Sequence, residues 1–249
     1  MAQHRFFVPP AAVQHGQVRL PADLSHQVAR VLRLRPGDEI VVLDGSGREY
    51  AARLVRADPR ETSAEIVATR LSRGEPALHI TLYQALLPRE KFELALQKGT
   101  EVGISAFVPV QTARSLAGTE AVTGEKLERW RRIVREAAEQ SERGRVPVVE
   151  PAERFPEAVR QAVRVGPALL AWERDNQHGP REILARLPSA GELALFIGPE
   201  GGFTAEEVEQ ALAAGATPIG LGPRILRAET AGPVLAMLAL FATGNLEPR

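Results

Sequence analysis

Phe196-Ile-Gly-Pro-Glu-Gly-Gly-Phe203 carries the strongest structural signal in this chain, and a second glycine-rich segment follows it, Ile219-Gly-Leu-Gly-Pro-Arg-Ile-Leu-Arg-Ala-Glu-Thr230. Each segment comes after a short apolar run typical of a strand and leads into a helix-like pattern. Glycines at the carboxyl end of a strand let the backbone turn sharply and approach a ligand closely. Neither segment has the spacing of a G-x-x-x-x-G-K-[ST] phosphate loop or a G-x-G-x-x-G fingerprint. The two loops therefore predict a cofactor other than ATP or NAD.

The glycine-rich segments lie in a region where predicted strands and helices alternate, from about residue 77 onward. Such alternation favours a mainly parallel sheet covered by helices on both faces. Ligands of such sheets bind beyond the carboxyl ends of the strands, where both glycine-rich segments begin. The expected strands are 79–86, 106–110, 146–149, 168–172, 193–197 and 218–221, and the expected helices include 90–102, 124–143 and 204–214.

The last two predicted helices have informative features. For the helix at 204–214, Thr204 is the expected N-cap, Glu207 completes a capping box, and Gly215 ends the helix. The final helix, residues 231–243, is apolar on nearly every face. A helix without a polar face is normally buried, so this one is expected either in the domain core or in a subunit interface.

The first seventy residues predict a small β-rich module. Short strands are expected at 5–8, 39–43, 48–55 and 63–69, and a helix at 21–33 has its apolar residues on one face. Asp44-Gly-Ser-Gly47 supplies a hairpin turn between the second and third of these strands. Short strands joined by tight turns favour a compact barrel, and the best linker candidate is Ser72-Arg-Gly-Glu-Pro76. The predicted domains are therefore residues 1–72 and 73–249.

Composition bounds the class of protein. The chain has 249 residues, 44% hydrophobic and 25% charged, as in soluble globular proteins. No apolar run approaches the ~18 residues of a membrane span, and the N-terminus lacks the pattern of a secretory signal. A cytoplasmic protein without membrane contact is therefore expected.

Missing residue types exclude several chemistries. The chain has no cysteine, which excludes disulfides, a thiolate nucleophile and a cysteine zinc site. Its five histidines are scattered without a metal-binding spacing, and no serine lies in a G-x-S-x-G context. We therefore expect no metal centre, and the active-site motifs of most hydrolases are absent from the sequence.

The charge is uneven along the chain although the net charge is zero. Residues 1–73 contain eleven arginines and eight acidic residues, and Lys91, Lys98 and Lys126 are the only lysines in the sequence. A GC-rich genome would produce this bias without functional pressure. The alternative is that arginine serves bidentate phosphate contacts and stacking on bases.

Five ordered motifs resemble one known family. They are Arg5-Phe-Phe-Val8 with Val31-Leu-Arg-Leu-Arg-Pro-Gly-Asp38, Gln97-Lys-Gly-Thr-Glu-Val-Gly103, Glu136-Ala-Ala-Glu-Gln-Ser141, Ile197-Gly-Pro-Glu-Gly-Gly202, and Leu221-Gly-Pro-Arg-Ile-Leu-Arg227 with Glu229-Thr230. Together they cover nearly the whole chain. The sequence resembles the bacterial 16S ribosomal RNA (uracil-N3)-methyltransferases, the RsmE family of the SPOUT superfamily. Ala228 departs from the threonine that the family often has there, which affects only a local side-chain contact.

This resemblance implies an α/β fold of two parts. The N-terminal part would be a PUA-like RNA-binding β-barrel, and the C-terminal part a SPOUT methyltransferase domain with a mainly parallel sheet and a deep trefoil knot. Family members act as homodimers, use S-adenosylmethionine, and methylate one uridine in the decoding region of 16S ribosomal RNA. The substrate would be this RNA, either free or within the assembled small ribosomal subunit.

S-Adenosylmethionine needs neither a metal nor a phosphate cradle, which agrees with the sequence. Apolar side chains of the second loop would sandwich its adenine, and the glycines would bring backbone groups to its edge. The alternative is that the glycines only form tight strand-to-helix turns. The expected cofactor-binding residues are Leu170, Gly198, Pro199, Glu200, Gly201, Gly202, Leu221, Gly222, Ile225, Leu226, Arg227 and Thr230.

Methylation at uracil N3 is an in-line displacement in which the nucleophile must lose its imide proton. A positive group near O2 or O4 would stabilise the uracil anion, and Arg227 is the best candidate. Glu229, or alternatively Glu200, would act as a base or orient a water. Each carboxylate has a structural alternative, hydrogen bonds at the N-terminus of the following helix. We therefore expect Arg227 and Glu229 as catalytic residues, without a definite assignment of the base.

RNA contacts are expected in the N-terminal part. Arg30, Arg33 and Arg35 cluster near the end of the first helix, and Arg5 lies beside two phenylalanines. Arginine contacts to phosphate give salt-dependent affinity with little sequence readout. The alternative is a solvated face with ion pairs to Asp38 or Glu39.

Two other functions remain open. One is a knotted methyltransferase with a different RNA target, although the lack of cysteine removes the covalent route to C5 of a pyrimidine. The other is a ribosome-assembly factor that binds RNA without chemistry.

Overall fold

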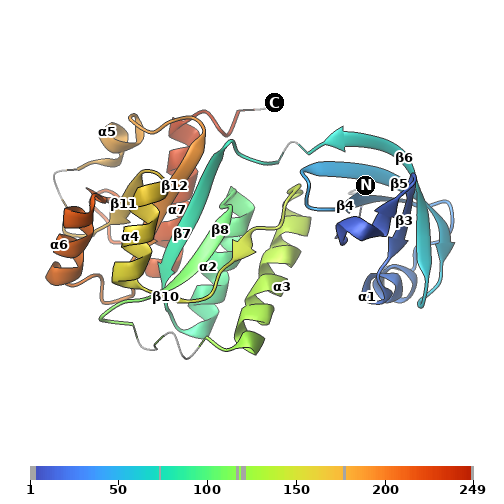
Figure 1. Ribbon diagram of the computed structural model, residues 1–249, viewed down its shortest axis with the longest axis horizontal. Coiled ribbons are helices and arrows are strands. Elements are labelled where there is room, and N and C mark those ends of the chain that lie inside the picture. The colour runs from blue at the N-terminus through green and yellow to red at the C-terminus, as the bar shows by residue number, and fades with distance from the viewer. Residues whose placement is uncertain (1–3, 73, 116–117, 119–121, 176–177, 248–249) are drawn as a thin grey trace. The chain divides into compact units, whose positions relative to one another are not determined.

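The computed structural model describes residues 4–72, 74–115, 118, 122–175 and 178–247. By its internal contacts the chain divides into two units, Met1–Glu75 with Ala138–Val146, and Pro76–Ala137 with Pro147–Arg249. Both units are drawn in Figure 1, and each is described by itself.

The first unit is a six-stranded sheet in the order β1–β4–β5–β6–β3–β2. Its pairs are antiparallel except for β1 with β4, which run parallel. The hairpin predicted at Asp44–Gly47 joins β4 to β5, and Asp44 Oδ1 accepts the backbone N–H of Ser46 at 3.0 Å. Closure of this sheet into a barrel stays a prediction. Its strands are β1 (Arg5–Phe7), β2 (Val13–Gln14), β3 (Gln17–Leu20), β4 (Glu39–Leu43), β5 (Arg48–Ala57) and β6 (Thr62–Leu71).

A helix is present at the predicted position, 21–33, but only its first part is an α-helix. α1 (Ala22–His26) continues directly into a π-helical turn, Gln27–Val31. A short 3-10 helix, Pro10–Ala12, precedes β2. The side chains that face inward from the helix and strands form the core of this unit: Phe6, Val18, Val28, Ile40, Val42 and Leu54.

A segment distant in sequence completes the first unit. Ala138 packs against Phe7, Val41 and Leu43. The buried guanidinium of Arg143 donates to the Glu75 carboxylate through Nε at 3.2 Å and through Nη2 at 2.8 Å. No local sequence pattern had indicated that residues 138–146 belong here.

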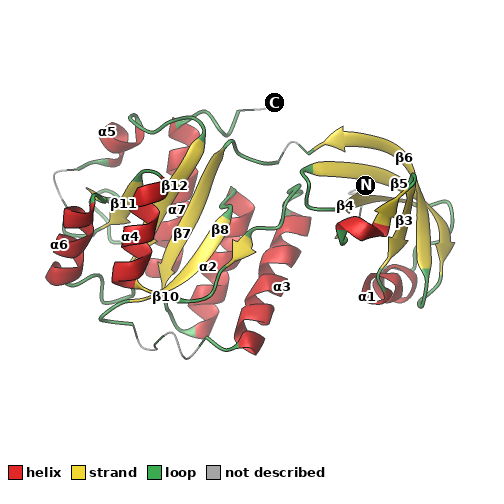
Figure 2. Ribbon diagram, viewed as in Figure 1, coloured by secondary structure: helices red, strands yellow, loops and turns green. Residues whose placement is uncertain are grey.

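The second unit contains the predicted parallel sheet, which is confirmed (Figure 2). In the described part of the chain it has seven strands, in the order β10–β8–β7–β12–β11–β13 with β9 also paired to β8. The knot implied by the family resemblance stays a prediction. The strands are β7 (Leu78–Ala85), β8 (Ala106–Gln111), β9 (Val148–Val149), β10 (Glu153–Arg154), β11 (Ala168–Ala171), β12 (Gly191–Ile197) and β13 (Thr217–Ile219).

Helices cover both faces of this sheet, as predicted (Figure 1). α4 and α6 pack together on one face, and α2 and α7 pack together on the other. The caps predicted for α6 are confirmed: Thr204 and Glu207 form a capping box, and Gly215 ends the helix with φ +107°. The helices are α2 (Arg89–Val102), α3 (Gly124–Gln140), α4 (Phe155–Val165), α5 (Pro180–Leu184), α6 (Ala205–Ala214) and α7 (Ala228–Ala242).

The final helix is buried on one face only. Leu235, Ala236, Ala239 and Leu240 of α7 lie in the core, whereas Phe241 is 70% exposed and Met237 and Leu238 are partly exposed. The prediction of burial in the core is therefore confirmed for half of the helix.

The order of three strands positions the functional site. β11 lies between β12 and β13, and Ala171 at its carboxyl end pairs with both Ile197 and Ile219. Because all three strands are parallel, the loops that follow them emerge side by side at one edge of the sheet. These loops include both glycine-rich segments.

No helix in the described ranges is long and apolar enough to cross a membrane. Nor do the residues that the structure describes include a cluster of three or more metal-binding side chains.

Candidate functional site

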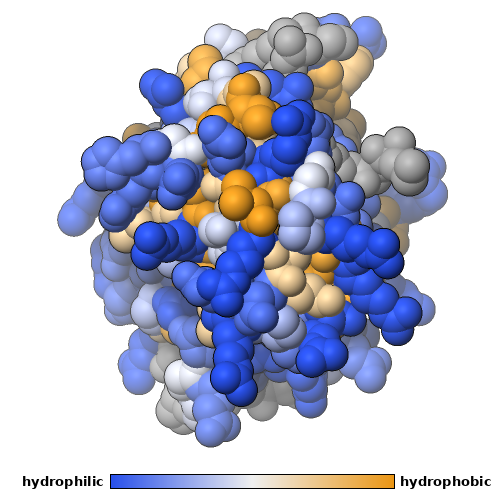
Figure 3. All heavy atoms as spheres, turned by 90° about the vertical axis from the view of Figure 1, so that its right-hand side faces the viewer, coloured by the Kyte–Doolittle hydropathy of each residue, from blue (hydrophilic) through white to orange (hydrophobic). Residues whose placement is uncertain are grey.

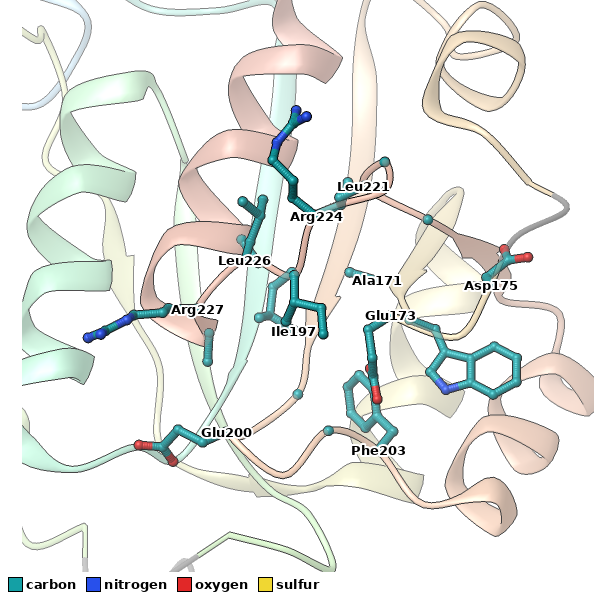
Figure 4. A pocket seen from close by; sticks show the side chains of 18 of the residues that line it. Ala171, Glu173, Asp175, Ile197, Glu200, Phe203, Leu221, Arg224, Leu226 and Arg227 are labelled. Carbon is teal, nitrogen blue, oxygen red and sulfur yellow. The ribbon is translucent and has the colours of Figure 1, made fainter.

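A cavity of about 820 Å³ lies at the carboxyl edge of β11, β12 and β13. The loops after these three strands form its wall, together with Lys91 of α2 and the start of α7 (Figure 4). Its size falls in the usual range of small-molecule sites, about 300–1,000 Å³. The cavity therefore has the place and size of a cofactor site in a parallel sheet.

All of the expected cofactor-binding residues line this cavity except Leu170 and Thr230. Leu170 is fully buried in the core between the sheet and α4, because side chains alternate along β11 and its neighbour Ala171 is the one at the cavity. Thr230 is exposed on the first turn of α7, outside the lining. The structure therefore does not bring these two expected residues to the cavity wall.

Two glycines are required by close approach of the chain. Gly202 has φ +68°, and a Cβ atom there would lie 2.7 Å from Glu173 Oε1. At Gly220 a Cβ would lie 2.4 Å from the backbone oxygen of Asp175. A larger residue at Gly220 would push the backbone of the loop after β11 away, whereas at Gly202 it would displace the end of the exposed Glu173 side chain. Gly220 thus allows the backbones of two of the three loops to approach each other.

Glu229 is a buried carboxylate in the first turn of α7. It is 7% exposed, lines the cavity, and its Oε2 atom has no hydrogen-bond partner among the described residues. Leaving a buried acceptor unsatisfied costs about 1–3 kcal/mol, so such an atom calls for an explanation. Glu229 is therefore a buried carboxylate at the cavity with one oxygen that no described residue satisfies.

Arg227 is close to Glu229 but only loosely tied to it. Its Nη1 atom lies 4.0 Å from Glu229 Oε1, and its side chain is 81% exposed. Figure 4 shows Arg227 and Glu200 on the same side of the cavity, with Arg224 pointing away from both. The guanidinium is thus free to meet a substrate that approaches the rim.

Glu200 is engaged in an ion pair. Its Oε1 atom accepts from Lys91 Nζ at 2.7 Å, and this hydrogen bond is the main reason that the pKa of Glu200 is lowered. Of the two carboxylates considered from the sequence, Glu200 is held by Lys91, whereas Glu229 has one oxygen without a hydrogen-bond partner among the described residues.

Comparison with known proteins supports the family that the sequence motifs indicate. The RNA methyltransferase domain family matches residues 74–240, and the RNA methyltransferase PUA domain family matches residues 20–67. The ribosomal RNA small subunit methyltransferase E of Synechocystis is 38% identical over 96% of this chain and 77% of its own length. That of Bacillus subtilis is 33% identical over 86% of both chains.

The chain belongs to the ribosomal RNA small subunit methyltransferase E family.

Solved structures of the family have the same fold. The family enzyme of Neisseria gonorrhoeae, bound to S-adenosylmethionine, superposes with a TM-score of 0.84 at 33% identity, covering 96% of this chain and 97% of its own. A methyltransferase of Legionella pneumophila in complex with the same cofactor gives a TM-score of 0.87 at 27% identity, with 97% and 98% covered.

Sequence reasoning missed the contribution of the loop after β11. Trp172, Glu173, Asp175 and His178 all line the cavity. The buried carboxylate of Asp175 holds the His178 ring, with Nδ1 3.0 Å from each of its oxygens. A usable signal existed, because this loop also begins at the carboxyl end of a predicted strand. Lys91, by contrast, is 109 residues from its partner Glu200 and had no local signal.

The arginines expected to contact RNA divide into two groups. Arg30, Arg33 and Arg35 are exposed. The alternative acidic partners are otherwise engaged, because Asp38 accepts the backbone N–H of Arg35 at 2.7 Å and Glu39 pairs with Arg53 at 3.1 Å. Figure 3 shows mostly hydrophilic side chains, with small apolar patches between them, on the face of the molecule that it presents.

Arg5 is a correction to the expected RNA contacts. Its side chain is only 8% exposed and is paired with the buried Glu49, with Nη2 2.6 Å from Oε2. Because its guanidinium is buried and paired within the first unit, Arg5 is no longer a candidate RNA-binding residue.

Proposed function

We propose that this chain methylates N3 of one uridine in 16S ribosomal RNA, with S-adenosylmethionine as the methyl donor. Membership of the family supports ribosomal RNA methylation, and the solved relatives that bind S-adenosylmethionine support the cofactor. The observation that carries the proposal is the cavity of about 820 Å³ at the carboxyl edge of β11, β12 and β13, which is walled by three glycine-containing loops and lined by Arg227 and Glu229.

The residues present fit this cofactor. Ile197, Leu221 and Leu226 supply apolar surface for a flat adenine ring, and backbone groups of the glycine loops can reach its edge. Gly202 and Gly220 keep the loops close enough to enclose a nucleoside. When bound, S-adenosylmethionine supplies an electrophilic methyl group.

The side chains at the rim supply the remaining chemistry. We assign the Glu229 carboxylate to accept the imide proton of N3, so that this nitrogen can form the new N–C bond as the S–C bond of the sulfonium breaks. We assign the exposed guanidinium of Arg227 to the negative charge that develops on O2 or O4.

RNA would be held first by phosphate contacts in the N-terminal unit. Arg30, Arg33 and Arg35 are the residues that we assign to this role, since they are exposed and their neighbouring acids are engaged. We further propose that the chain acts as a homodimer through the exposed apolar face of α7. Bacterial ribosomal RNA as substrate implies that the protein acts in the cytoplasm.

Nucleoside mass spectrometry of 16S ribosomal RNA from a strain that lacks this protein tests the proposal. We expect 3-methyluridine to disappear, to return with the wild-type chain, and not to return with Glu229→Gln. An undiminished level of 3-methyluridine in the deletion strain would exclude the proposed target. Offering the purified protein free 16S RNA and assembled small subunits in parallel identifies which of them is the substrate.

Calorimetric titration with S-adenosylmethionine separates this proposal from a non-catalytic assembly factor. We expect binding at one site per chain. The absence of heat with both the cofactor and its demethylated product would favour the assembly factor.

A further inference from the structure

A tight turn after β8 reaches the cofactor loop from outside the cavity. Within Thr112–Ser115, the backbone N–H of Ser115 donates to the oxygen of Thr112 at 3.2 Å, and the N–H of Thr112 donates to Ser115 Oγ at 3.1 Å. The two hydroxyls lie 2.9 Å apart. The turn is thus fixed by its own hydrogen bonds. It contacts the loop after β12 even though β7 lies between β8 and β12 in the sheet.

Two hydrogen bonds join this turn to the segment that follows β12. The backbone N–H of Ala113 donates to Glu207 Oε1 at 2.7 Å, and Arg114 Nη1 donates to the backbone oxygen of Gly201. The second oxygen of the buried Glu207 accepts the N–H of Thr204 at 2.9 Å in the capping box. One carboxylate therefore ties the β8 turn to the start of α6.

The bond from Arg114 fixes one peptide of the glycine-rich loop. The carbonyl of the Gly201–Gly202 peptide accepts from Arg114, and its N–H donates to Pro199 O at 2.9 Å. Both polar groups of this peptide therefore have a hydrogen-bond partner within the protein. Glycine loses more conformational freedom than any other residue when it is ordered, so a loop with two adjacent glycines needs external contacts to hold one shape.

We propose that Arg114 is a positioning residue for the cofactor: it does not line the cavity but holds the Gly201–Gly202 peptide in the shape that binds S-adenosylmethionine. This inference rests on the proposed function for the identity of the ligand. Without Arg114, binding of the cofactor would have to order the loop, and its affinity would fall by that cost. The rival roles are a direct RNA contact, because Arg114 is exposed, and a purely structural contribution.

The variant Arg114→Met tests the proposal, because it keeps the apolar stem and removes the donor. Arg160→Met is the matched control, since Arg160 is an exposed arginine on α4 paired with Glu157. For Arg114→Met we expect about a tenfold weaker calorimetric Kd for S-adenosylmethionine, which corresponds to one charge-assisted hydrogen bond. The KM for the cofactor should rise similarly while kcat at saturation stays near the wild-type value. The control should match wild type.

Further measurements separate the alternatives. We expect unchanged RNA affinity without cofactor and a melting temperature close to wild type. Normal cofactor affinity with weakened RNA binding would overturn the proposal in favour of an RNA contact. If Arg114→Met proves unstable, Arg114→Gln takes its place: weaker cofactor binding at a melting temperature close to wild type supports positioning, whereas affinity that falls only together with the melting temperature assigns a structural role and overturns the proposal. Failure of the wild-type chain to bind the cofactor would instead count against the proposed function itself.

Discussion

The backbone N–H of Leu34 donates a 3.0 Å hydrogen bond to the oxygen of Val28, closing the end of the first helix around Arg33. Arg33 has φ +56°, in the left-handed region where helix ends usually have glycine. A side chain costs about 1–2 kcal/mol there. The π-helical turn just before it is a second irregularity of a kind often found at functional sites. Arginine therefore occupies a position where a side chain costs stability.

We predict that Arg33→Gly makes the protein more stable and weaker in RNA binding. Urea unfolding should give about 1 kcal/mol of added stability, because the strain is relieved. The slope of log affinity against log salt should fall by about one unit for the lost phosphate contact. Arg33→Lys, which keeps both charge and strain, should behave like wild type in both assays. An unaltered salt slope in Arg33→Gly would mean that this guanidinium does not touch phosphate.

A second prediction concerns the contact between Gly202 and Glu173. Gly202→Ala adds a Cβ that would lie 2.7 Å from the Glu173 carboxylate at a backbone φ of +68°, so the Glu173 side chain that lines the cavity must turn aside and the glycine-rich loop is strained. We expect S-adenosylmethionine to bind at least about tenfold more weakly by calorimetry. Gly215→Ala is the control: Gly215 has a comparable positive φ, but nothing lies within 4 Å of its Cβ position. Gly215→Ala should lose a similar amount of stability and keep full cofactor affinity. Equal losses of cofactor affinity in the two variants would mean that Gly202 is not part of the cofactor site.

Several elements could be predicted because their signals are local. β4 has the predicted bounds, since a run of apolar and β-branched residues lies between a turn at Pro36–Asp38 and a hairpin. The ends of α6 were predictable from the capping box and Gly215. α4 was overlooked, although Phe155, Ala158, Val159 and Ala162 have helical spacing and are all buried. That miss was one of interpretation, because the pattern was present.

Other features depend on tertiary contacts and leave no local trace. Residues 138–146 join the first unit through Ala138 and Arg143, whose partners lie far away in sequence. In the site, the glycine loops were found from their composition, but the cavity also needs β11 to lie between β12 and β13. Nearness to the strand end predicts Leu170 at the site, but side chains alternate along β11, so Leu170 lies in the core and Ala171 at the cavity.

A third prediction concerns acid stability of the first unit. Burial tends to raise the pKa of Glu49, but hydrogen bonds from Arg5 and Arg70 outweigh it and hold the pKa below its usual value. Because the folded pKa is the lower one, the ionised carboxylate stabilises the fold above the unfolded pKa near 4.5. This contribution is lost as pH falls through the folded pKa.

Glu49→Gln should therefore unfold more easily at pH 7, by about 3 kcal/mol, because Arg5 keeps a buried charge without its partner. The difference from wild type should shrink as pH falls below about 4.5. Urea unfolding of the first unit at a series of pH values measures both effects. Glu39→Gln, which removes an exposed pair with Arg53, should change stability by less than about 1 kcal/mol at pH 7. A constant difference between wild type and Glu49→Gln across the series would contradict the assigned ionisation.

The exposed face of α7 leads to a prediction about assembly. Phe241 is 70% exposed and shares this surface with Met237 and Leu238, and Leu94 of the adjacent α2 is also exposed. Burying one phenylalanine is worth about 1.5–3 kcal/mol, and a two-fold interface would bury it twice. Light scattering should thus give twice the 27.0 kDa chain mass for wild type and a single chain for Phe241→Glu. The control, Val165→Glu, places the same charge at an exposed apolar residue of α4 on the opposite face of the sheet, and should remain dimeric. A dimer that survives Phe241→Glu but dissociates in Val165→Glu would move the interface to the other face.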